Sequence, residues 1–234
     1  MTTSIERDLA LIQETYTAIG LAKLGLGSLQ SIGKGNDFYH LPLQLLAGSY
    51  ERLLKVMLAI DHKQRQGEYP NYEDFRKHGH NITKLLSKVT EEMFFGASWI
   101  TATAGAEDLK FLRSDSLHQE LVSVLTHFGK FGRYSDLDVV SGKETVSSPE
   151  SDWKRIEMKI LATSDLDSLS TPRGLPEVRD KINEIIVSKF EIAFRALCRW
   201  FTLGGGAPLG QQMSGILTPF LNLSSSSIGK TKWG

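Results

Sequence analysis

The strongest constraint on the fold is one long amphipathic segment at residues 41–66. Its apolar side chains recur mostly at spacings of three and four, which places them on one face of a helix. They are Leu43, Leu46, Tyr50, Leu53, Leu54, Met57 and Ile60. Pro42 suits a first helical turn, and Gly67 suits the left-handed position that ends a helix. A helix of about 25 residues is about 37 Å long, so the remaining chain is expected to pack around it.

Capping residues predict further helices around this segment. Thr3 and Glu6 have the spacing of a capping box. Glycines weaken the helix that begins after Thr3. This first helix is therefore predicted either to bend near Gly25 or to let a neighbouring helix approach closely. Later helices are predicted at residues 72–77, from Asn81, at 106–113, after Ser114 or Ser116, at 148–162 and from Pro176. The predicted fold class is therefore all-α, a bundle of long antiparallel helices with additional short helices.

Glycine and serine set the C-terminal residues apart from the rest of the chain. A triplet of glycines at residues 204–206 ends the last long helix, and a serine run follows a short apolar piece. Such a segment has little apolar surface with which to form its own core. We therefore predict one helical domain at residues 1–203 and a loosely packed tail at 204–234. This tail is expected either to dock on the bundle or to be partly disordered.

Charge and cysteine content restrict the classes of function. The chain has 234 residues, with 27 Lys and Arg balanced by 27 Asp and Glu. A neutral total argues against coating nucleic acid through bulk charge, and it leaves room for a local basic patch. Cys198 is the only cysteine, so no intramolecular disulfide is expected and a reducing, cytoplasmic location is predicted. No signal-peptide core and no apolar run of about 18 residues is present, so no membrane association is expected.

A turn after the long segment concentrates His, Arg and Lys and resembles a known family. Residues 79–82 read Gly-His-Asn-Ile and residues 84–86 read Lys-Leu-Leu, while Glu51 and Lys55 lie inside the preceding helix. Residues 133–134 supply an Arg-Tyr step after a later helix. This arrangement resembles the HEPN superfamily (higher eukaryotes and prokaryotes nucleotide-binding) and its abortive-infection relatives.

The resemblance covers about residues 40–140, and it implies both a fold and a class of function. HEPN proteins are helical bundles that often form homodimers with a site at the shared groove. A homodimer is therefore expected here, with RNA as a partner. The implied function is that of an RNA-acting protein in prokaryotic defence or toxin–antitoxin systems, as a metal-independent endoribonuclease without a cofactor.

Two sets of residues are candidates for the RNA site. HEPN ribonucleases typically use an Arg that stabilises phosphate oxygens and, four to six residues later, a His that supplies acid–base chemistry. Arg113 and His118 have this spacing and are the predicted catalytic pair, although Ser114 stands where the family usually has Asn, Asp or His. The second set is predicted to contact RNA phosphates beside a helix start. It consists of Arg76, Lys77, His78, His80 and Lys84.

The same residues allow a second interpretation. The chain could be a non-catalytic helical module that kept the bundle and acts through a protein partner. Arg113 and His118 would face one open groove in a ribonuclease and would point apart in such a module. The basic cluster could likewise be a capped helix junction in which His80 forms a hydrogen bond across the bundle. A metal site is not predicted, because His78 and His80 are two residues apart and no third ligand is near.

Overall fold

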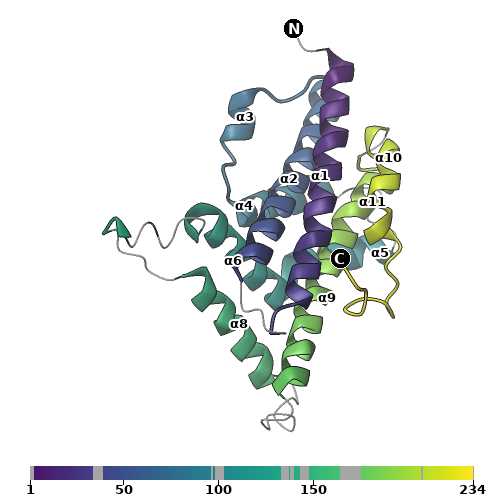
Figure 1. Cartoon of the computed structure of the whole chain (residues 1–234). Helices are drawn as coiled ribbons and strands as arrows, with labels where there is room; N and C mark the ends of the chain where they lie inside the picture. The colour runs from purple at the N-terminus through teal and green to yellow at the C-terminus, as the bar shows by residue number, and fades with distance from the viewer. Residues whose placement is uncertain are drawn as a thin grey trace.

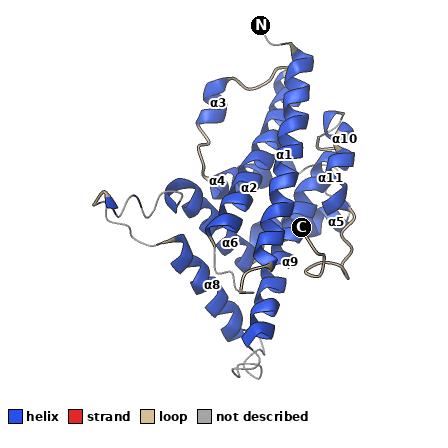
Figure 2. Cartoon of the chain, viewed as in Figure 1, coloured by secondary structure: helices blue, strands red, loops and turns tan. Residues whose placement is uncertain are grey.

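The computed structural model describes residues 3–33, 39–95, 97, 103–132, 137, 140–142, 148–163, 175–206 and 208–233. Within these ranges the regular elements are all helices, as Figure 2 shows, and the predicted all-α fold is confirmed. The elements are α1 (Ser4–Gln30), α2 (His40–Gln66), α3 (Tyr72–Arg76), α4 (Ile82–Val89), the π-helical turn η1 (Thr90–Phe94), α5 (Thr103–Ser114), α6 (Ser116–Phe131), α8 (Pro149–Thr163), α9 (Leu175–Thr202), α10 (Leu209–Gln212) and α11 (Ser214–Leu221).

Two long helices, α2 and α9, organise the core (Figure 1). The α2 helix packs against α1, α4 and α6, and α9 packs against α1, α5, α6, α8 and α11. Tyr50 connects α2 with α9, because its ring centroid lies 5.9 Å from that of Phe190 and 4.7 Å from that of Phe194, both on α9. The apolar face predicted for residues 41–66 is buried, which confirms that the other helices surround this segment.

Local sequence signals set most helix ends as expected. Thr3 and Glu6 form the predicted capping box, and Gly67 ends α2 with φ of 79°. The α6 helix differs, because its N-cap is Asp115 rather than either neighbouring serine, and the Asp115 carboxylate accepts the N–H of His118 at 2.9 Å. The α5 helix also begins at Thr103, three residues before its predicted start.

The surroundings of Gly25 distinguish the two predictions for the first helix, a bend or a close approach by a neighbouring helix. The α1 helix continues through this position to Gln30. A β-carbon on Gly25 would lie 2.8 Å from Leu46 Cγ and 3.3 Å from Leu45 Cβ. The glycine therefore permits α1 and α2 to pack closely.

Replacing this glycine is expected to strain the α1–α2 interface. Gly25→Ala should lower the free energy of unfolding by about 1–2 kcal/mol, because overpacking outweighs the gain in helix propensity. Gly48→Ala is the matched control on α2, since its β-carbon would meet Leu21 Cδ1 at an ordinary 3.5 Å. Urea denaturation should show the control to be as stable as the wild type or more stable. Equal stability of both variants would contradict the close approach.

The C-terminal segment docks on the bundle instead of remaining loose. Leu217 and Phe220 of α11 are fully buried, and Trp233 is almost fully buried. Gln30 at the end of α1 holds the last residues in place, because its side chain donates to the Thr231 carbonyl and accepts the Trp233 N–H. Residues 208–233 therefore belong to the same core as the rest of the bundle.

Candidate phosphate-binding site

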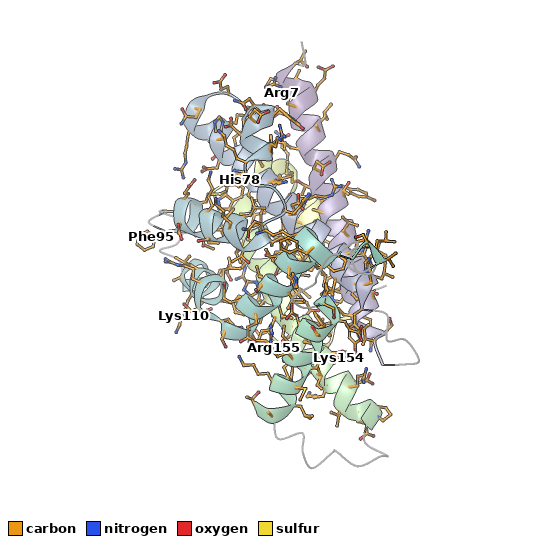
Figure 3. The ribbon with its side chains drawn as sticks, turned by 90° about the vertical axis from the view of Figure 1, so that its left-hand side faces the viewer. Arg7, His78, Phe95, Lys110, Lys154 and Arg155 are labelled. Atoms are coloured by element: carbon orange, nitrogen blue, oxygen red, sulfur yellow. The ribbon has the colours of Figure 1, made fainter. Side chains whose placement is uncertain are left out.

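A short elbow between α2 and α4 carries the basic cluster. Asn71 and Asp74 form a capping box that starts α3. Gly79 then reverses the chain with φ of 51°, and the Asn81 side chain caps α4 by accepting the Lys84 N–H at 3.1 Å. These local signals place His78 and His80 on either side of a left-handed glycine. Figure 3 labels His78 at this elbow.

A cavity of about 340 Å³ lies between α2, the elbow, α4 and η1. We call it the basic pocket. The apolar part of its wall includes Leu58, Ala59, Pro70 and Phe75. Basic side chains outnumber acidic ones in the rest of the wall. The basic side chains are Lys55, His62, Arg65, Lys77, His78 and Lys88, and the acidic ones are Asp61, Asp74 and Glu92.

Among the described residues, the other lysines and the arginine that line the basic pocket form ion pairs, and Lys88 is the exception. Lys77 lies 2.8 Å from Asp74, and Arg65 lies 2.9 Å from Asp61. Lys88 has no ion-pair or hydrogen-bond partner among the residues that the structure describes. Its ammonium group is therefore available to an anionic ligand.

Burial and the nearby lysines change the pKa of His78. Burial, followed by the positive charges of Lys88, Lys55 and Lys84, lowers the pKa of His78 below its ordinary value. His78 is therefore mainly neutral at pH 7, so one ring nitrogen donates a hydrogen bond and the other accepts one. A bound phosphate would be stabilised by the same lysines.

The predicted cluster is divided between two cavities. His80 lies on the other side of Phe75, in a second cavity of about 360 Å³ that also borders Lys55. Its Nδ1 is 2.9 Å from Glu51 Oε2, and Lys55 Nζ is 2.7 Å from Glu51 Oε1. Burial raises the pKa of Glu51, but the hydrogen bonds from Lys55 and His80 outweigh it and hold this pKa below its usual value. His80 thus forms the cross-bundle hydrogen bond of the capped-junction interpretation.

The remaining cluster residues are exposed. Arg76 lies 3.7 Å from Glu73 in an exposed pair. Lys84 has no ion-pair or hydrogen-bond partner among the described residues other than the backbone contact of its own N–H, and its charge reaches His78. Neither side chain lines the basic pocket or the second cavity.

The predicted catalytic pair lies in two different environments. His118 is fully buried, with Nε2 3.2 Å from the Tyr50 hydroxyl and its ring 5.1 Å from that of Phe111. Its Nδ1 has no hydrogen-bond partner among the described residues, and burial lowers its pKa to about 4. Arg113 is exposed and lies over the Phe95 ring at 5.7 Å. The two side chains do not share an open groove in this conformation.

Sequence reasoning missed Lys88 and Arg65 as site residues. Lys88 follows Lys84 by four positions, so both lie on one face of α4, and this spacing was a usable signal. Arg65 carried no such signal, because its place in the pocket depends on a contact between distant parts of the chain, in which it donates to the Glu92 carbonyl of η1. The residues of the Arg-Tyr step at 133–134 lie outside the described residues.

Comparisons with protein-family models, with curated proteins and with solved structures find no match for this chain. The HEPN resemblance therefore stays a prediction. Among the described residues, no helix is long and apolar enough to cross a membrane. The same part of the chain contains no group of three His, Cys, Asp or Glu side chains that could hold a metal ion.

Proposed function

We propose that the chain is an RNA-binding protein that holds backbone phosphates in the basic pocket. The observation that supports this most directly is that Lys88, which has no partner among the described residues, lines the pocket with Lys55 and a half-buried His78. On the HEPN resemblance, we also propose that the protein acts in the cytoplasm, in a prokaryotic defence or toxin–antitoxin system.

Aromatic side chains on α3, which borders the basic pocket, favour RNA over a free phosphate. Tyr72 is 76% exposed on α3, and Phe75 borders both cavities. The two residues are three positions apart and lie on neighbouring parts of one helical turn. Unstacked bases of single-stranded RNA bind to exposed aromatic rings, while lysines contact the backbone.

A non-catalytic role has its own support. His118 is closed off from solvent and mainly neutral, and Arg113 points to a different environment. RNA binding in the basic pocket does not depend on this pair. We therefore keep the helical interaction module as the second candidate function, and we treat cleavage as a separate question that the assay below answers.

Removing the free ammonium group should weaken RNA binding. Lys88→Gln is expected to weaken the affinity for a short fluorescent single-stranded RNA several-fold and to reduce the slope of log affinity against log salt by about one. Lys110→Gln is the matched control, because Lys110 likewise has no partner among the described residues but is exposed on α5, well away from His78 in Figure 3. Fluorescence anisotropy at several salt concentrations measures both quantities.

Two results would contradict the proposed function. Wild-type protein that binds no RNA would leave the interaction module as the better proposal, and unchanged binding by Lys88→Gln would exclude this pocket. The same samples should be scored for RNA cleavage with His118→Ala and His80→Ala. Cleavage that survives both substitutions would exclude both histidines as catalytic residues.

A further inference from the structure

The outer face of α1 carries a row of apolar side chains that the other described elements leave largely uncovered. Ile5, Leu9 and Tyr16 are 71%, 59% and 65% exposed, and Ile12 between them packs partly against the core and is partly exposed. The spacings of four, three and four residues place these side chains on one face of the helix. Single exposed apolar residues are common, whereas a row along one helix marks an interaction surface.

The spacing of this row is symmetric about Tyr16, although the residues in its two halves differ. The same spacing continues to Gly20 and Lys23. Ile12 and Gly20 each lie four positions from Tyr16, and Leu9 and Lys23 each lie seven positions from it. Large side chains thus occupy the first half of the row, while a residue without a side chain lies in the second half.

We propose that α1 pairs antiparallel with α1 of a second copy, with the two-fold axis at Tyr16. Ile12 then lies opposite Gly20 of the second copy. A β-carbon on Gly20 would meet nothing within 4 Å in the chain itself, so the space beside it is open to a partner side chain. Leu9 lies opposite the aliphatic stem of Lys23 of the second copy, which can cover it while the ammonium group stays in water.

The charged residues of α1 favour an antiparallel pair of helices over a parallel one. Lys23 has no ion-pair partner among the described residues. In the antiparallel pair it lies within one turn of the exposed Glu6 of the second copy. A parallel pair would set Lys23 against Lys23 and leave a gap between two glycines at position 20, and both features are unfavourable. This pairing is independent of the proposed RNA site.

Filling the gap at Gly20 tests the pairing. Light scattering after size exclusion, at tens of micromolar chain, should give twice the 26.0 kDa of the monomer for the wild type. Gly20→Leu should be monomeric with a melting temperature at least equal to that of the wild type, measured at low concentration, because leucine favours the helix. Gly215→Leu on α11 is the matched control, since this exposed glycine also has no neighbour within 4 Å, and it should remain dimeric.

Engineered cysteines report the direction of the pair. Tyr16→Cys should form an intermolecular disulfide under oxidation. Ile12→Cys alone should not, whereas a mixture of Ile12→Cys and Gly20→Cys chains should. Cys198 is fully buried and does not interfere.

Three results would overturn the proposal. They are a wild-type monomer at these concentrations, a dimer that survives Gly20→Leu, and self-crosslinking of Ile12→Cys. A monomer that binds lipid vesicles through α1 would assign the row to a membrane surface instead.

Discussion

Trp233→Ala is expected to lower the free energy of unfolding by about 3–5 kcal/mol, the range for large aromatic side chains removed from a core. The Trp233 ring stacks on Phe220 with centroids 4.9 Å apart, and its Nε1 donates to Glu191 Oε1 at 2.6 Å. Glu191 is fully buried, so the substitution also leaves its carboxylate with one hydrogen bond among the described residues, from the N–H of Gly229. Urea denaturation followed by circular dichroism measures this loss.

Two further substitutions separate packing from hydrogen bonding. Trp233→Phe keeps an aromatic ring beside Phe220 and removes the indole N–H, so its effect should be smaller, at about 1–3 kcal/mol. Tyr72→Ala removes an aromatic side chain that is 76% exposed and should change stability by less than about 0.5 kcal/mol. A loss below about 1 kcal/mol for Trp233→Ala would show that the C-terminal segment contributes little to the core.

The C-terminal segment shows how an average over composition hides a local pattern. Glycine and serine dominate the segment, but Leu209, Met213, Leu217 and Phe220 recur at spacings of four, four and three and are all buried. These residues pack on α9, which supplies the large apolar surface that the segment lacks. Its glycines also have a packing role, because a β-carbon on Gly205 would lie 2.2 Å from Trp200 Nε1.

Helix ends and buried faces were predictable where the signal lies within one or two turns. The boundaries of α2 follow from its apolar spacing and from Gly67, and the start of α3 follows from Asn71. The N-cap of α6 was missed because three adjacent residues, Ser114, Asp115 and Ser116, all have capping side chains. Choosing among such neighbours depends on tertiary contacts, here the ion pair of Asp115 with Lys189 at 2.7 Å.

The candidate site was less predictable because it depends on which way each side chain faces. The spacing of Arg113 and His118 indicates a catalytic motif when it is taken alone. His118 also precedes Leu121, Val122 and Leu125 by three, four and seven positions, which places it on the buried face of α6. The basic cluster was divided because Gly79 reverses the chain between His78 and His80.

Lowering the pH from 7 to 4 is expected to reduce the free energy of unfolding by about 3 kcal/mol through His118 alone. Burial, opposed by Asp115 and reinforced by Lys189, lowers the pKa of His118 to about 4 in the folded chain. The imidazole of the unfolded chain has a pKa of about 6.5. Between these two values the unfolded chain binds more protons than the folded chain, so stability falls as the pH falls. Above about pH 6.5 the full contribution is present.

A double substitution isolates this contribution from the other titrating groups. His118→Phe combined with Tyr50→Phe removes the titrating ring together with its hydrogen-bond partner, so no new unpaired polar group is left in the core. The difference in stability between wild type and double variant, from urea denaturation at several pH values, should fall by about 3 kcal/mol between pH 7 and pH 4. A constant difference would mean that His118 titrates near pH 6.5 in the folded chain. The imidazole would then be hydrated. The interpretation of Arg113 and His118 as a catalytic pair, with His118 as the acid–base group, would again be favoured.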